Sequence, residues 1–162
     1  METEVLIFEC NGDRFGVPAS QVSEVVRAVA VSPTPQTPDF VLGVINLRGA
    51  LVTVVDARML LSLPQDEIHH SHQFVILNCR GGLLALHVDR AIDLIHAEYN
   101  NEANDSSSDQ SDGQGFVDGT VNTELGIVPI LSAERLLSDQ DARSIRIGAI
   151  RLGTGSSTSE SN

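Results

Sequence analysis

Residues 5–26 read VLIFECNGDRFGVPASQVSEVV, and residues 75–95 repeat this stretch as VILNCRGGLLALHVDRAIDLI. When the two stretches are aligned, Cys10 corresponds to Cys79 and Gly12 to Gly81. Each copy consists of an apolar run, a glycine turn, a second apolar run, and a polar link to a third apolar run. This order predicts a β-hairpin followed by a third strand, twice in one chain.

The second half of each copy repeats as well. LVTVVDARMLL at residues 51–61 aligns with IVPILSAERLL at residues 127–137. Each copy therefore has sequence for about five short strands and one short helix, the helices being expected at residues 57–61 and 133–137. Short strands at this spacing, separated by glycine turns, predict small barrels.

The second copy carries extra residues before its last hairpin. Residues 98–115, EYNNEANDSSSDQSDGQG, contain acidic residues, no basic residue and almost nothing apolar, which predicts a flexible loop. Residues 143–152 alternate apolar and polar side chains, and we expect a last strand that crosses back to complete a barrel. The tail at residues 153–162 is expected to be disordered.

Composition limits the classes of function. The chain has 162 residues, 41% of them apolar, and a net charge of −12. This charge disfavours nucleic acid and anionic membrane surfaces, because both attract basic faces. No apolar run reaches the roughly 18 residues of a membrane span, and the start has no signal-peptide features. Cys10 and Cys79 lie in apolar runs, so we expect two buried thiols in a reducing cytoplasm.

Candidate chemistry is sparse. The sequence contains no nucleophile elbow, P-loop or dinucleotide-binding motif. The run HHSH at residues 69–72 is the best metal candidate, but no acid or cysteine lies at a helpful spacing, so loop histidines are the favoured interpretation. His87 is expected to make one backbone hydrogen bond. We therefore expect no enzyme activity, no cofactor and no metal.

One charge, Arg48, interrupts the apolar stretch at residues 40–55. Gly49 is expected to adopt a positive φ in a turn, and Asp56 to cap the helix that follows. Arg48 then either pairs with a nearby acid, Asp56 or Asp39, or is held out for a partner. A surface ion pair contributes only about 0–1 kcal/mol, which is little reason for a specific residue.

The stretch GVINLRGALVTVVDAR at residues 43–58 resembles the signature of CheW-like domains, which runs G-x-x-N-L-R-G-x-x-x-P-V-x-D. The resemblance extends over residues 4–151 through FECNGDRFGVPASQVSEVV, a proline-rich link, ALHVDRAIDLI and GIVPILSAERLL. It implies a mainly β fold of two five-stranded SH3-like barrels packed around a shared core, with two or three short helices. We expect one domain over residues 1–152, made of two intertwined barrel subdomains.

The resemblance also implies a function. Members of this family couple methyl-accepting chemoreceptors to a CheA-type histidine kinase, so we expect a stand-alone, non-catalytic adaptor. The implied partners are the helical hairpin at the receptor tip, the regulatory domain of the kinase and other CheW-like domains. The implied location is the cytoplasm, in receptor arrays at the inner face of the membrane, without insertion into it.

Family positions map onto individual residues of this chain. Glu24 and Arg48 match positions tied to receptor and kinase coupling, and Val44 and Ile45 are expected to flank a groove for the receptor tip. The resemblance thus assigns Glu24, Val44, Ile45, Asn46 and Arg48 to partner binding.

Gly49 and Asp56 match the family motif and are assigned structural roles. Thr53 departs from it, because the family usually has proline there; a β-branched residue is expected to preserve the strand. Two alternatives stay open. The same adaptor fold could serve a chemotaxis-like pathway that controls pili, biofilm or a second messenger, or the histidines and cysteines could make this a metal or redox protein.

Overall fold

The computed structural model describes residues 2–79, 82–100 and 117–132. These residues are almost entirely β-structure, which confirms the predicted mainly β class. The strands are β1 (Glu2–Cys10), β2 (Asp13–Pro18), β3 (Val22–Arg27), β4 (Val41–Leu47), β5 (Ala50–Asp56), β6 (Gln73–Cys79), β7 (Gly82–Val88), β8 (Arg90–Asn100), β9 (Val117–Thr123) and β10 (Gly126–Leu131). The short helical elements in the described part are η1 (Ala19–Gln21) and α1 (Ala57–Leu60).

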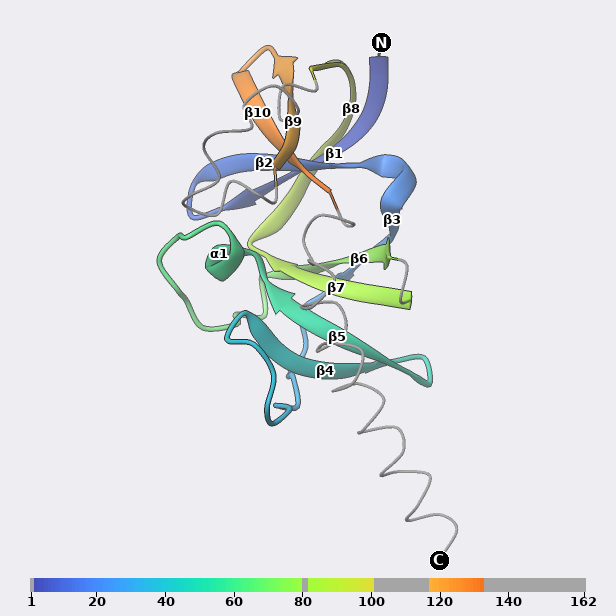
Figure 1. Ribbon diagram of the computed structural model, residues 1–162, viewed down its shortest axis with the longest axis vertical. Coiled ribbons are helices and arrows are strands. Elements are labelled where there is room, and N and C mark those ends of the chain that lie inside the picture. Colours follow the sequence, from blue (N-terminus) through green and yellow to red (C-terminus); the bar gives the residue numbers. More distant parts are fainter. Residues whose placement is uncertain (1, 80–81, 101–116, 133–162) are drawn as a thin grey trace, which may run out of the picture.

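The strands form two five-stranded units, one above the other in Figure 1. The upper unit is a closed barrel in the order β1-β2-β10-β9-β8, hereafter the closed barrel. The lower unit has the order β3-β6-β7-β5-β4, hereafter the open sheet, with β3 and β4 at its edges. The expected pair of five-stranded units is confirmed.

The two sequence copies interleave in these units. The first copy supplies β1 and β2 to the closed barrel and β3, β4 and β5 to the open sheet. The second copy supplies β6 and β7 to the open sheet and β8, β9 and β10 to the closed barrel. The sequence predicted a crossing only at residues 143–152, which lie outside the described residues. The structure shows that the chain already crosses between units at β3 and again at β8.

The apolar runs of β1 and β6 are continuous because both faces of these strands are buried. In β1, Val5 and Ile7 point into the closed barrel, whereas Leu6 and Phe8 join a core between the two units. In β6, Phe74 belongs to the core of the open sheet, and the next residue, Val75, joins the core between the units. Alternate side chains of a strand point to opposite faces, so one strand serves two cores.

The core between the two units confirms the shared core that the family resemblance implied. It draws on both copies and on both units. Its buried members are Leu6, Phe8, Cys10, Val17, Val41, Val55, Ala57, Leu60, Val75, Leu77, Leu84, Leu86, Val88 and Leu131.

A polar network also joins the two units, and no sequence pattern indicated it. The Arg58 guanidinium on α1 donates to both carboxylate oxygens of Asp89, at 3.0 and 2.8 Å, and to the Pro64 carbonyl at 2.9 Å. Asp89 lies between β7 and β8, and its carboxylate also accepts the backbone N–H of Asn11 in the β1–β2 turn, at 2.9 Å. The Asp89 carboxylate therefore connects the β1–β2 turn of the closed barrel to α1, which follows β5 of the open sheet.

Several local predictions fall on described residues. The helix predicted at residues 57–61 is α1, and the Asp56 carboxylate caps it by accepting the Arg58 N–H at 3.0 Å. The predicted loop at residues 98–115 starts too early, because β8 continues to Asn100. The predictions for residues 101–115, 133–137 and 153–162 lie outside the described residues, and the domain boundary at residue 152 stays a prediction.

Candidate partner-binding site

The β4–β5 hairpin turns through Arg48 and Gly49. Leu47 pairs with Ala50, so only these two residues form the loop. Arg48 has φ +50° and Gly49 has φ +92°, which is the type I′ geometry that matches the twist of a hairpin. The positive φ predicted for Gly49 is confirmed. The Asn46 side-chain oxygen accepts the Gly49 N–H at 2.8 Å and so fastens the turn.

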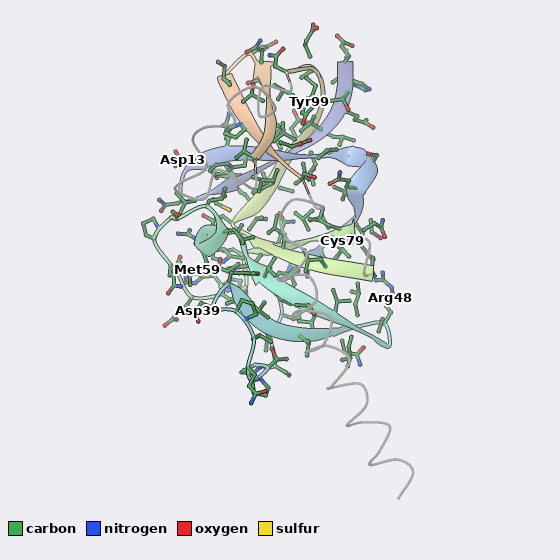
Figure 2. The ribbon with its side chains drawn as sticks, in the orientation of Figure 1. Asp13, Asp39, Arg48, Met59, Cys79 and Tyr99 are labelled. Atoms are coloured by element: carbon green, nitrogen blue, oxygen red, sulfur yellow. The ribbon has the colours of Figure 1, made fainter. Side chains whose placement is uncertain are left out.

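Arg48 extends from the end of this hairpin (Figure 2) and forms an ion pair with Glu24 of β3. The predicted pairing of Arg48 with Asp56 or Asp39 is wrong, because Arg48 pairs with Glu24. Asp56 is buried and caps α1. Glu24 lies on one edge strand of the open sheet, and Arg48 follows the other. The ion pair therefore spans the two edges of the unit that does not close.

The Glu24–Arg48 pair is largely exposed. The Arg48 side chain keeps 66% of its surface accessible, and the Glu24 side chain keeps 31%. An exposed pair of this kind contributes about 0–1 kcal/mol to folding, because water competes with it. Arg48 thus pairs with an acid and also presents its guanidinium to solvent, and its role in binding a partner stays a prediction.

Val44 and Ile45 lie beneath this surface rather than on it. Each is only 5% exposed. Ile45 packs in the core of the open sheet, and Val44 pairs through its backbone with Ser32. Exposed side chains beside Arg48 are instead Asn46 and Leu51, the latter at the start of β5. The expectation that Val44 and Ile45 flank an open groove is therefore not met in this conformation.

Thr53, which replaces the usual proline of the motif, is buried in β5. β5 is an inner strand, and Thr53 is registered between Val44 of β4 and Leu84 of β7. A β-branched side chain suits such a position, so the expected preservation of the strand is confirmed.

The histidines of the HHSH run occupy the loop that was expected for them, between α1 and β6, but their contacts differ from the expectation. His72 is buried, and its Nδ1 lies 2.8 Å from Nε2 of His87. His87 therefore pairs with another imidazole through Nε2. His69 approaches Asp66, with Nε2 and Oδ1 3.4 Å apart. Sequence spacing gave no sign of the His72–His87 contact, because 15 residues and a whole strand separate the two.

Comparisons with known proteins agree with this architecture. The family described as "CheW-like domain" matches residues 4–141. "Chemotaxis protein CheW" of Bacillus subtilis (strain 168) is 26% identical over 141 residues, covering 87% of this chain and 90% of that relative. The protein of the same description from Thermotoga maritima is 26% identical over 134 residues, covering 80% and 88%.

A solved structure gives the same picture of the fold. The crystal structure of the scaffolding protein TtCheW from Thermoanaerobacter tengcongensis matches with a TM-score of 0.75 and 22% sequence identity. The match covers 87% of this chain and 96% of that chain. Among the described residues, no helix has the length and apolar character needed to cross a bilayer.

The described residues form a closed barrel and an open five-stranded sheet around a shared core, and the candidate site is an exposed ion pair at a hairpin of the open sheet. The family match extends over most of the sequence. The chain therefore belongs to the CheW-like domain family, as the GVINLRG stretch indicated, and its role is that of a chemotaxis adaptor.

Proposed function

We propose that this chain is a non-catalytic adaptor that couples chemoreceptors to a CheA-type histidine kinase. Its partners are the helical hairpin at the cytoplasmic tip of the receptor and the regulatory domain of the kinase, with other CheW-like domains as further neighbours. It acts in the cytoplasm, in receptor arrays at the inner face of the membrane. Family membership supports the coupling role, and the relatives' descriptions name chemotaxis and scaffolding.

One observation supports a binding role for the open sheet in particular. The Glu24–Arg48 pair is mostly exposed, so its contribution to folding is small. The type I′ turn nevertheless holds Arg48 in a positive-φ conformation, which is uncommon for a residue with a side chain. The turn sets the direction in which the Arg48 side chain leaves the backbone, and its exposed guanidinium has N–H groups beyond those facing Glu24 that can donate to a partner.

The surface that we assign to partners consists of Glu24, Asn46 and Arg48. Val44 and Ile45 support it from below, since their side chains pack under the hairpin that carries Arg48. β3 and β4 also belong to this surface, because they are the edge strands of the open sheet in the part of the chain that the structure describes. An edge strand can pair with an approaching chain, although Val44 of β4 is already paired with Ser32.

Binding measurements with matched variants test this proposal. Wild type, Arg48→Ala and Glu24→Ala are titrated with a recombinant receptor hairpin and, separately, with the regulatory domain of the cognate kinase. Arg48→Ala is expected to weaken binding to at least one partner by about 10–100-fold, the range for a charged residue at an interface.

Arg90→Ala is the matched control. Arg90 lies on the closed barrel, its side chain is 63% exposed, and it pairs with Glu9 at 3.0 Å. Arg90→Ala therefore removes a comparable surface ion pair. Its affinity for both partners is expected to stay within about twofold of wild type, since rim charges contribute little. Equal losses for Arg48→Ala and Arg90→Ala, or no loss for either, would remove Arg48 from the binding surface.

A further inference from the structure

The loop at residues 61–72, between α1 and β6, brings three metal-ligating side chains together. A carboxylate oxygen of Asp66 and one ring nitrogen each of His69 and His72 all lie within 4.8 Å of one another. Asp66 Oδ1 and His69 Nε2 are 3.4 Å apart. Two ligands of a tetrahedral zinc ion, each at about 2.0–2.1 Å from the metal, also stand roughly 3.4 Å apart.

His72 is held in place before any ion binds. The residue is only 7% exposed, and its Nδ1 lies 2.8 Å from His87 Nε2. A metal-ligating histidine donates its second ring N–H to a partner, which fixes the ring orientation and the tautomer. Donation from His72 Nδ1–H to His87 Nε2 leaves the lone pair of His72 Nε2 for a metal. His87, itself buried, is suited to be that supporting residue.

The electrostatic setting also suits a cation. Three carboxylates, those of Asp56, Asp66 and Asp89, lie around the two buried histidines. The one guanidinium among these contacts, that of Arg58, is 2.8 Å from Asp89 and 3.9 Å from Asp66, so acids outnumber it.

We propose that Asp66, His69 and His72 bind a zinc ion, which closes the loop at residues 61–72 onto His72, whose ring contacts His87 of the open sheet. Two imidazoles and one carboxylate are ligands that Zn²⁺ accepts, and a water molecule completes the tetrahedron. From the sequence we expected no metal, because no acid or cysteine lies at a helpful spacing from the HHSH run. The fold supplies that acid, since the loop turns Asp66 back onto His69. This site is separate from the proposed partner surface.

Calorimetric titration with ZnCl₂ tests the proposal. The full chain is prepared without a histidine tag and freed of metal with a chelator, in wild-type, His69→Ala, Asp66→Asn and His70→Ala forms. Wild type is expected to bind one Zn²⁺ per chain and to melt at a higher temperature when Zn²⁺ is present. His69→Ala and Asp66→Asn are expected to weaken Zn²⁺ binding by at least about 10–100-fold.

His70→Ala is the matched control, because His70 is the next residue, is exposed, and is not in the cluster. Its Zn²⁺ affinity is expected to stay close to wild type. MgCl₂ is expected to give no heat, since Mg²⁺ prefers oxygen ligands. Metal-free His69→Ala should melt like metal-free wild type, because His69 is exposed. No Zn²⁺ binding by wild type, or equal losses for His69→Ala and His70→Ala, would overturn the site.

Discussion

The closed barrel and the open sheet are built from equivalent strands in the same order, yet only one of them closes. In the closed barrel, the third strand of the repeat is β8, which has 11 residues. Its end reaches β9, where Tyr99 pairs with Val121. The equivalent strand of the open sheet is β3, which has six residues and does not pair with β4. The chain instead meets β4 once, through Ser32 and Val44.

The chain that follows each third strand also differs. Residues 31–39, VSPTPQTPD, contain three prolines. Proline has no backbone N–H and cannot extend a hydrogen-bonded ladder. Among the described residues β3 and β4 are the edges of the open sheet, and the Glu24–Arg48 ion pair spans them. One repeated unit thus yields a closed structural barrel and an open sheet with a charged surface.

The charges also differ between equivalent positions. In the alignment of the two copies, Glu24 corresponds to Asp93, and Arg48 corresponds to Glu124. The closed barrel therefore places two acids where the open sheet has an ion pair. Beside them it has a cavity of about 390 Å³, lined in part by Asp93 and Glu124. The two copies therefore share their strands and differ in the charges at these equivalent positions.

The largest expected effect concerns Gly43 and Gly119, two equivalent glycines at which an added Cβ would meet a backbone carbonyl oxygen. A Cβ on Gly43 would lie 2.0 Å from the Ser32 carbonyl oxygen, and Gly43 has φ +145°. Its equivalent, Gly119, would place a Cβ 2.5 Å from the Asn100 carbonyl oxygen at an ordinary φ. Gly43→Ala should lower the free energy of unfolding by more than about 4 kcal/mol, and Gly119→Ala by less, because only Gly43 adds backbone strain.

Urea denaturation of both alanine variants measures this difference. A larger loss of unfolding free energy for Gly119→Ala would contradict this prediction. It would mean that the β8–β9 pairing stabilises the closed barrel more than the single Ser32–Val44 bridge stabilises the open sheet.

The second prediction concerns the link between the two units. Arg58→Ala leaves the Asp89 carboxylate without its bidentate partner in a partly buried place. The free energy of unfolding is expected to fall by about 3 kcal/mol, as for a broken buried pair. Arg90→Ala, which removes the exposed pair with Glu9, is the control and should cost under about 1 kcal/mol in the same urea titration. Similar losses for the two variants would mean that the network does not join the units energetically.

The third prediction compares the two equivalent cysteines. Cys10 is fully buried, and burial raises the pKa of its thiol to about 12, whereas Cys79 is half-buried. Alkylation requires the thiolate, and Cys10 stays protonated from pH 7 to pH 9. Iodoacetamide should therefore modify Cys10 at least about 100-fold more slowly than Cys79 in the folded protein. Peptide mass spectrometry measures both rates, and a denatured sample, in which the two rates should converge, is the control.

The smallest expected effect is that of Arg48 on stability. Arg48→Ala should change the free energy of unfolding by less than about 1 kcal/mol, because the pair with Glu24 is exposed. Thermal melts beside Arg90→Ala measure it. A loss of several kcal/mol would make Arg48 a structural clasp between β3 and β4, and the contrast between the open and closed units would then concern folding rather than binding.

Much of the fold follows from local patterns in the sequence. The two copies, the hairpins, the turn at Gly49 and the cap at Asp56 were all predicted, and the structure confirms them. These features depend on residues close together in the chain: side-chain alternation makes strands, and glycine permits the positive φ of a tight turn. The family motif at residues 43–58 pointed to Arg48 in the same local way, because the motif is one contiguous stretch of sequence.

Other features depend on how the strands are ordered, which no local pattern contains. The packing of the strands brings Glu24 to Arg48 across 24 residues, Arg58 to Asp89 across 31, and His72 to His87 across 15. Only the folded chain shows that Val44 and Ile45 lie beneath the surface. Such contacts form when distant strands pack on a common core, because packing places in contact side chains whose separation in sequence carries no signal.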